Sequence, residues 1–149
     1  MAMTEDPTKL FPLVAQVSAV YEAISVEIQE PIAKAGLTDS MFQLLSTIKA
    51  GGGEATQARV AEALGITPAS LSEAVRDAEA QGLVIRKQQD GDKRVKMLDL
   101  TDQGQSALRV CFRGLEAVEA KATKGLSADD LRQAQSTLRK ALANLIREG

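Results

Sequence analysis

The sequence contains no histidine, only one cysteine and few aromatic residues. Without histidine the chain lacks the commonest general base and the commonest zinc ligand. The single cysteine excludes a disulfide within the chain and a metal site built from several cysteines. Aromatic residues make up 3% of the chain, and a core of leucine, isoleucine, valine and alanine favours packed helices over a β-sandwich. We therefore expect a binding protein without cofactor or metal, and not an enzyme.

No apolar run in the sequence approaches the roughly 18 residues that a membrane-spanning helix needs. The N-terminal stretch MAMTEDPTKL is polar and acidic, so we do not expect it to be a signal peptide. These two features predict a cytoplasmic protein that does not act at a membrane. The 149 residues are 44% apolar and 26% charged, which predicts a single globular domain over 1–149.

Apolar residues repeat at helical spacing near both ends of the chain. Near the N-terminus, intervals of four and three residues predict a helix over 8–35 with a narrow apolar seam. The members of this seam are Leu10, Val14, Val17, Tyr21, Ile24 and Ile28. Pro7 and Pro12 place the start of the helix, and Pro31 and Gly36 mark its end or a kink. A second seam near the C-terminus contains Leu131, Ala134, Leu138, Ala141, Leu142, Leu145 and Ile146.

The terminal segments 8–35 and 101–149 are predicted to form a dimer interface, with ordinary core inside one chain as the alternative. The residues predicted for the interface are Leu10, Val14, Val17, Leu138, Leu142 and Leu145. Thr101 and Ser127 are expected to cap the two helices of the C-terminal segment. Gly114 lies inside the first of these helices, where glycine costs about 1 kcal/mol relative to alanine. We therefore expect another element to pack closely against Gly114.

Residues 38–100 predict a helix-turn-helix lobe that ends in a two-stranded wing. Thr38 is expected to cap one helix, and Thr56 caps a short helix that closes at Gly65. Thr67 caps the next helix, with Pro68 at its favoured first position. The two short helices are expected to pack through Val60, Ala61, Leu64, Ile66, Leu71 and Val75. The predicted fold class is mainly α with a small β-wing, a winged helix-turn-helix flanked by N- and C-terminal dimerisation helices.

The second helix of the motif predicts a DNA-reading surface near its start. Its outward residues are Pro68, Ala69, Ser70, Ser72, Glu73 and Arg76. Short hydroxyls bond phosphates or base edges, and an arginine reaches guanine or phosphate. The alternative is that the serines are merely solvated helix residues.

A charged hairpin follows this helix directly. Strands are predicted at 83–87 and 95–100, and Asp90-Gly91 between them is a strong hairpin signal. Residues 86–96 carry five basic and two acidic side chains, although the whole chain has a net charge of −2. The local field decides where a phosphate binds, so Lys87, Lys93 and Arg94 are predicted DNA contacts. The alternative is a solvated hairpin whose lysines protect its edge.

The motifs G-L-V-x-R at 82–86, D-x-R at 92–94, L-T-x-x-G at 100–104 and L-S-x-D-D at 126–130 resemble the MarR (multiple antibiotic resistance regulator) family. The resemblance implies a homodimeric winged-helix regulator of transcription, expected to repress, whose two recognition helices enter successive major grooves of a pseudo-palindromic site. It implies that Arg94 reaches near the minor groove and that Asp92 orients Arg94. It also implies release from double-stranded DNA by a small aromatic or phenolic anion, for which the sequence names no binding residues; a ligand-independent or constitutive repressor is the alternative.

Two residues depart from the family pattern. Glu73 stands where a basic residue is frequent, and Ala78 stands where leucine is usual. An acidic Glu73 either accepts a hydrogen bond from cytosine N4 or repels phosphate. The alternative function is therefore a winged-helix protein-interaction module that has lost DNA binding. Cys111 is expected to be a buried, inert thiol, with a redox sensor as the alternative.

Overall fold

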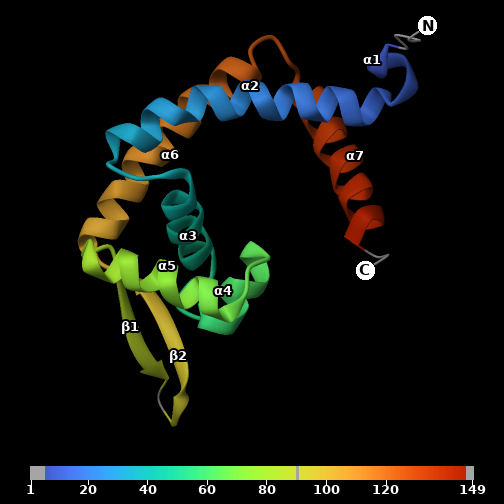
Figure 1. Ribbon diagram of the computed structural model, residues 1–149. Helices are drawn as coiled ribbons and strands as arrows, with labels where there is room; N and C mark the ends of the chain where they lie inside the picture. The colour runs from blue at the N-terminus through green and yellow to red at the C-terminus, as the bar shows by residue number, and fades with distance from the viewer. Residues whose placement is uncertain (1–5, 90, 147–149) are drawn as a thin grey trace, which may run out of the picture. The chain divides into compact units, whose positions relative to one another are not determined.

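The computed structural model describes residues 6–89 and 91–146, which form two compact units, Met1–Leu115 and Glu116–Gly149. Figure 1 shows a mainly helical chain with one β-hairpin between α5 and α6. The elements are α1 (Pro7–Leu10), α2 (Pro12–Lys34), α3 (Asp39–Ala50), α4 (Gln57–Leu64), α5 (Pro68–Ala80), β1 (Val84–Gln89), β2 (Asp92–Leu100), α6 (Asp102–Ala122) and α7 (Ala128–Ile146). The predicted mainly helical class with a two-stranded wing is confirmed.

Threonine caps begin three consecutive helices. The backbone N–H of Met41 donates to Thr38 Oγ1 at 3.3 Å. The backbone N–H of Arg59 donates to Thr56 Oγ1 at 3.2 Å. The N–H of Ser70 donates to Thr67 Oγ1 at 3.1 Å. Each bond satisfies a backbone donor that the first helical turn leaves unpaired. These caps confirm the predicted starts of α3, α4 and α5.

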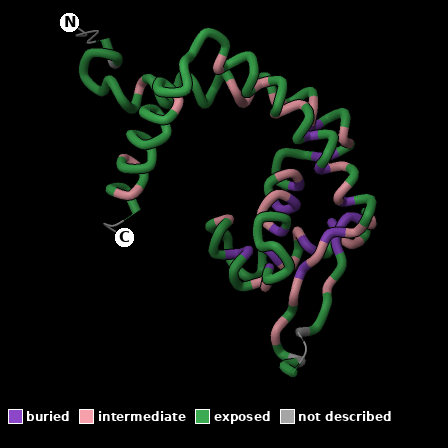
Figure 2. Tube along the Cα trace, turned by 180° about the vertical axis from the view of Figure 1, so that it is seen from behind, coloured by how far each residue is buried: buried purple, intermediate pink, exposed green. Residues whose placement is uncertain are grey.

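The core of the first unit gathers where α3, α4 and α5 meet the base of the hairpin. Figure 2 shows the buried residues concentrated there, while the far part of the hairpin is largely exposed. The fully buried side chains of largest volume are Leu44, Leu45, Leu71, Leu98, Leu108, Val60, Val75, Val84 and Cys111. No charged or polar residue is buried among the described residues. Because α5 and the base of the hairpin both bury side chains in this aliphatic cluster, the cluster holds the two elements in a fixed position relative to each other.

The turn between α4 and α5 is closed by Gly65, which has φ +65°. Its N–H donates to Glu62 O at 3.1 Å, and the N–H of Ile66 donates to Ala61 O at 3.1 Å. This pair of bonds is a Schellman motif, which ends a helix with a left-handed glycine. The prediction that Ile66 is a core plug is wrong, since its side chain is 38% exposed. The turn leaves Ile66 at the rim, and Leu71 and Val75 fill the interior instead.

The strands are longer than the sequence predicts. They pair antiparallel from Val84 opposite Leu100 to Gln88 opposite Lys96, then shift register so that Gln89 faces Asp92. The extra pairing around Gln88 takes up residues that the sequence assigns to the loop. Gly91 has φ +90°, as the Asp-Gly signal requires, and Asp90 lies outside the described residues.

Helix α2 continues through Pro31 to Lys34 and is followed by Gly36 at φ +72°. Proline so close to a C-terminus breaks few helical bonds. The ring of Pro31 packs against Gly114 of α6, where an added Cβ would overlap the ring. This contact confirms the close approach predicted at Gly114.

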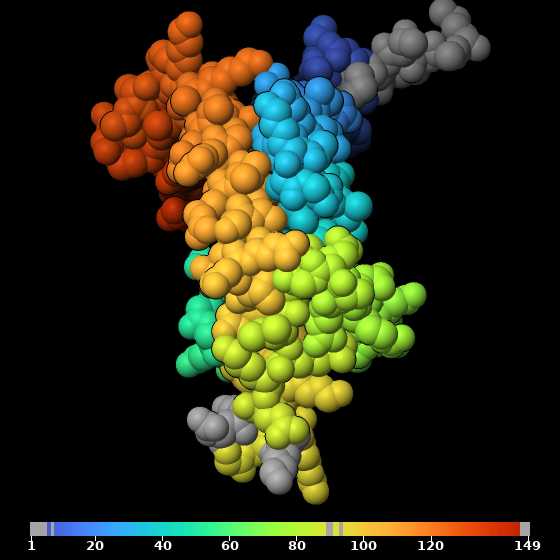
Figure 3. Space-filling view, turned by 90° about the vertical axis from the view of Figure 1, so that its left-hand side faces the viewer, coloured from blue at the N-terminus to red at the C-terminus, as the bar shows by residue number. Residues whose placement is uncertain are grey.

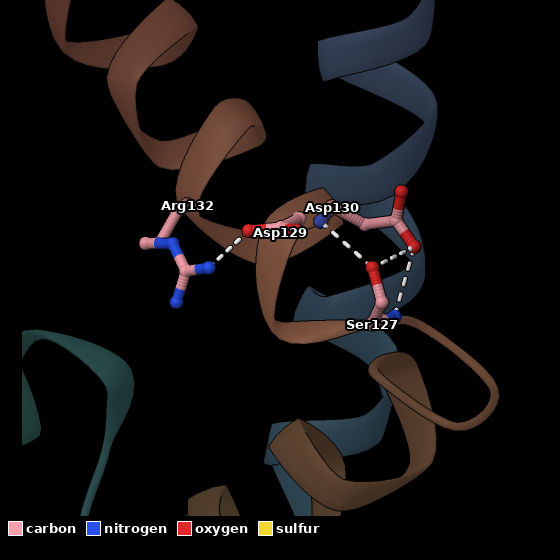
Figure 4. A network of polar contacts seen from close by, with 4 residues as sticks. All are labelled: Ser127, Asp129, Asp130 and Arg132. Atoms are coloured by element: carbon pink, nitrogen blue, oxygen red, sulfur yellow. Dashed lines mark hydrogen bonds and ion pairs between the residues drawn. The ribbon is translucent and has the colours of Figure 1, made fainter.

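In the second unit, Ser127 caps α7 as predicted. Its hydroxyl accepts from the N–H of Asp130 at 3.1 Å, and its own N–H donates to Asp130 Oδ2 at 2.8 Å (Figure 4). These bonds form a capping box closed by an aspartate. The hydrogen bonds that the Ser127 N–H and hydroxyl donate to Asp130 Oδ2 hold the pKa of Asp130 below its usual value. Arg132 adds an ion pair to Asp129 in the same turn. None of the helices in the described ranges is long and apolar enough to cross a bilayer.

Candidate nucleic-acid interface

Helix α5 presents a polar outer face that begins at its N-terminus. Its exposed members among the predicted contacts are Pro68, Ala69, Ser70, Glu73 and Arg76. Ala69, Glu73 and Arg76 are four and three residues apart, so they share one stripe of the helix. Within the described part of the chain, Glu73 and Arg76 form no hydrogen bond or ion pair, which leaves both charged groups available to a ligand.

Ser72 belongs to a different side of α5. It is half-buried, and its hydroxyl accepts from Gln57 Nε2 of α4 at 3.5 Å. Its backbone carbonyl accepts from Arg86 NH2 of β1 at 3.3 Å. The structure therefore places Ser72 in the joint between α4, α5 and the hairpin, apart from the outer stripe of α5.

The hairpin projects beyond α5, as Figure 3 shows at the lower end of the molecule. Cross-strand pairs share a sheet face, so the pairs Arg86–Leu98 and Gln88–Lys96 define the face that packs toward α5. Lys87 pairs with Met97 on the opposite face. Basic residues that are neighbours in the sequence are thus divided between two surfaces.

Arg86 joins the wing to α5. Its NH1 lies 3.4 Å from Glu79 Oε2, and both side chains are 30% exposed. With the bond to the Ser72 carbonyl, this pair fixes β1 against α5 at two points, one in each half of the helix. Its buried Nε has no partner among the described atoms. Arg86 therefore sets the position of the wing instead of offering a free charge.

Lys87 is occupied within the sheet. Its Nζ lies 2.7 Å from Asp99 Oδ2, two residues along β2 from its cross-strand neighbour Met97. The hydrogen bond from Lys87 holds the pKa of the Asp99 carboxyl below its usual range. The Lys87 charge is therefore offset by a neighbouring carboxylate, which weakens its attraction for phosphate.

The D-x-R motif shapes the backbone near the hairpin end. Asp92 Oδ1 accepts from the backbone N–H of Arg94 at 2.9 Å. Asp92 therefore orients Arg94 through the main chain, in the irregular part of β2 where the register shifts. The Arg94 side chain is exposed. The side chain of Lys93 lies outside the described part of the structure.

Sequence reasoning counted Lys96 among the basic residues beside the hairpin tip without naming it as a contact, and it left Arg59 out. Both are exposed, and both line a groove with Arg94 between the start of α4 and β2. For Lys96 the signal was its place two residues from buried Leu98, which puts it on the face toward α5. For Arg59 no local pattern pointed to the hairpin, since 35 residues separate it from Arg94.

The predicted dimer residues are exposed in the single chain. Leu10 lies in α1, Val14 and Val17 lie in α2, and all three have accessible side chains. In the second unit, Leu138, Leu142 and Leu145 of α7 are also exposed. Cys111 is 1% exposed inside the core, and burial raises the pKa of its thiol. Across the described residues, no group of three or more potential His, Cys, Asp or Glu ligands is positioned to hold a metal.

The winged helix-turn-helix matches known proteins. The model of the MarR family matches residues 35–95. The chain is similar to the HTH-type transcriptional repressor MdtR of Bacillus subtilis (strain 168), with 26% identity over 116 residues, 78% of this chain and 74% of that protein.

Two solved structures share the fold. A mutant of MarR from E. coli in complex with operator DNA has a TM-score of 0.75 and 21% identity, covering 93% of this chain and 99% of that one. A MarR transcriptional regulator from Methanosarcina mazei Go1 has a TM-score of 0.75 and 16% identity, covering 92% and 98%. The segment that contains the helix-turn-helix and the first strand of the wing thus matches the MarR family of transcriptional regulators, and solved MarR structures share the fold of most of the chain.

Proposed function

We propose that this protein is a dimeric, sequence-specific regulator that binds double-stranded DNA and represses transcription in the cytoplasm. One observation carries the proposal. Arg76 on the outer face of α5 and Arg94 and Lys96 on the wing are exposed cations without partners among the described residues. An arginine on a recognition helix suits base edges, and cations on a wing suit phosphates and the minor groove. A mutant of MarR from E. coli, which shares the fold, has been crystallised with operator DNA.

The contacts to DNA fall into two groups under this proposal. Glu73 and Arg76 face the major groove, where a carboxylate accepts from cytosine N4 and an arginine donates to guanine. Pro68, Ala69 and Ser70 lie at the start of α5, close to the backbone that borders the groove. Arg94 enters beside the minor groove from the wing. Two-fold symmetry then predicts half-sites about 10 base pairs apart, centre to centre.

Selection of bound sequences from random duplex DNA tests the proposal most directly. The expected result is an enriched pseudo-palindrome, with log K falling against log salt at a slope near −7 if about 8 phosphates are contacted. Arg94→Ala is expected to weaken binding to most sequences by about tenfold, or about 1.4 kcal/mol. Lys49→Ala, at the exposed end of α3, removes the same charge from another surface and serves as the control. Equal affinities for Arg94→Ala and the parent chain contradict the role of the wing.

A protein-interaction module is the second candidate, favoured by the acidic, exposed Glu73 on α5 and the net charge of −2. The salt titration separates the two functions. A module of this kind shows no salt-sensitive binding to random duplex DNA, because it does not displace counterions.

Release by a small aromatic or phenolic anion completes the proposal. A cavity of about 400 Å³ lies inside the first unit between the ends of α2 and α5 and the first half of α6. It offers apolar walls with a few polar groups, which include Lys34, Gln103 and Ser106. That mixture suits a small ring with a charged substituent. Binding there lowers DNA affinity only if the anion prefers a conformation whose recognition helices do not fit DNA.

A further inference from the structure

A groove of about 700 Å³ separates the N-terminal part of α4 from β2. Its lining includes three cations, Arg59, Arg94 and Lys96, and one carboxylate, Glu54. The first turn of α4 contains no acidic residue, so Glu54 is the one carboxylate of the described lining that offsets the positive end of the helix dipole. The groove is therefore a local site of positive potential on a chain that is acidic overall.

The two walls of the groove are joined by backbone contacts. The N–H of Leu98 in β2 donates to Ala55 O at 2.8 Å, and Thr56 forms an isolated β-bridge with Met97. Thr56 also caps α4 through the N–H of Arg59. These contacts set the spacing between Arg59 on one wall and Lys96 on the other before any ligand arrives, and such preorganisation reduces the entropic cost of binding.

Glu54 forms an ion pair with Arg59, one of the three cations that line the groove. Its Oε2 lies 3.4 Å from Arg59 NH1, with side chains 82% and 69% exposed. An ion pair this exposed contributes little to stability, so Arg59 exchanges it easily for another anion. Arg94 and Lys96 have no side-chain hydrogen bond or ion pair with any described residue.

The groove also adjoins the recognition helix. Gln57, which lines it, donates from Nε2 to Ser72 Oγ of α5 at 3.5 Å. On the wing side, Lys96 lies on the sheet face that packs toward α5. An anion held between α4 and β2 would therefore flank the bases that face α5.

We propose that this groove holds a backbone phosphate of bound duplex DNA, contacted by Arg59 and Lys96, and that Glu54 competes with that phosphate for Arg59. The inference rests on the DNA-binding function proposed above. It adds α4 to the predicted contacts and makes Glu54 a residue that limits affinity. A guanidinium and an ammonium on opposite walls, one forked and one a point charge, match the oxygens of a single phosphate.

The test is a salt titration of duplex binding by the full chain, followed by fluorescence anisotropy. Arg59→Gln and Lys96→Gln are each expected to reduce the steepness of the salt dependence by about 1 per protomer, or about 2 for a dimer. Lys49→Gln removes one positive charge beside Asp99, away from the groove, and is expected to leave the slope within about 0.5 of the parent value. Slopes for Arg59→Gln and Lys96→Gln equal to that of Lys49→Gln overturn the inference.

Glu54→Gln tests the competitor role in the opposite direction. It is expected to tighten DNA binding about two- to threefold, the size of a weak exposed ion pair. In the Arg59→Gln background the same change is expected to have no effect, because the partner is already gone. An equal gain in both backgrounds overturns the competitor role, since it indicates a general charge effect. Circular dichroism of each variant excludes loss of the fold as the cause.

Inorganic phosphate distinguishes DNA from a free anion as the occupant. At constant ionic strength, phosphate and chloride are expected to inhibit DNA binding equally. Stronger inhibition by millimolar phosphate that disappears in Arg59→Gln assigns the groove to a free anion and contradicts the inference. Absence of any duplex binding by the parent chain defeats the proposed function itself, and with it the assignment of the groove. Binding by the parent with unchanged slopes in the variants defeats only the groove.

Discussion

Cys111 carries a thiol, which is a potentially reactive group, but its side chain is buried in the core. Its Sγ lies 3.9 Å from Pro31 O, and burial raises the pKa of the thiol. Because the thiolate is the reactive form, little of it exists at neutral pH. We expect iodoacetamide at pH 7.5 to label native Cys111 on the order of 100-fold more slowly than the unfolded chain.

The matched control is Ser136→Cys on the exposed surface of α7, combined with Cys111→Ser. That thiol is expected to react at the rate of a free cysteine. Native Cys111 labelled as fast as this control would indicate an accessible, activated thiol and revive the redox-sensor hypothesis.

The basic residues of the wing differ in their surroundings although the sequence presents them as one run. Arg86 is held by Glu79 and the Ser72 carbonyl, whereas Lys87 is paired with Asp99. Lys96 projects from the face toward α5 without a side-chain partner in the described chain. Sequence reasoning counted all of them as positive charge near a hairpin tip. The count was correct, but which charges are free depends on strand register and on partners up to 14 residues away.

Local features of the elements could be predicted, because their determinants lie within a few residues. Thr38, Thr56 and Thr67 each bond a backbone N–H three residues ahead, so the sequence alone locates three helix starts. Ile66 could not be assigned in this way, since its exposure follows from how the turn after Gly65 approaches the core. The groove between α4 and β2 was missed for the same reason, because it forms only when two distant segments pair.

The family motifs at the base of the wing serve the joint between α5 and α6. The hydroxyl of Thr101 donates to Gly82 O at 2.6 Å and accepts from the N–H of Gly104 at 3.0 Å. The N–H of Thr101 donates to Leu83 O at 3.1 Å, and a Cβ at Gly104 would overlap the same carbonyl. G-L-V-x-R and L-T-x-x-G are therefore explained by packing, and they carry evidence for the fold more than for a DNA contact.

The crossing of α2 and α6 gives a test at the scale of elements. Gly114→Ala adds a methyl group that overlaps the Pro31 ring. Overpacking costs about 1–3 kcal/mol, which exceeds the gain in helix propensity of about 1 kcal/mol at most. We expect a lower melting temperature by circular dichroism, by about 3 °C for each kcal/mol of net destabilisation.

Removal of the Pro31 side chain is expected to make space for a methyl group at position 114. The double variant Pro31→Gly/Gly114→Ala is expected to melt above Gly114→Ala, because glycine at 31 removes both the Cγ and the Cβ that the new methyl group would overlap. A single Gly114→Ala variant that melts above the parent chain would show that the two helices separate at little cost. The crossing would then not be a fixed point of the first unit.

At the scale of the whole molecule, α2 and α7 each expose several large apolar side chains. In addition to the six predicted dimer residues, the exposed large apolar side chains include Phe11, Leu13, Val20, Tyr21, Val26 and Ile146. Apolar surface of this extent marks an interaction site in a protein that functions in water. A second copy of the chain is the occupant that the proposed function requires, since two recognition helices must reach two half-sites.

Leu142→Glu tests this dimer. Leu142 is 58% exposed on α7, and a two-fold interface introduces the charge twice, so the cost of burial is doubled. We expect a monomer by light scattering at micromolar concentration and at least a roughly 100-fold loss of affinity for a full palindrome, because the half-sites no longer bind as one unit. Binding to an isolated half-site should change little, since α5 and the wing are intact.

Ser136→Glu adds the same charge to an exposed position outside the seam and is expected to remain a dimer. A Leu142→Glu chain that stays dimeric would place the interface elsewhere, and one that is monomeric yet keeps full affinity for the palindrome would separate dimerisation from DNA recognition.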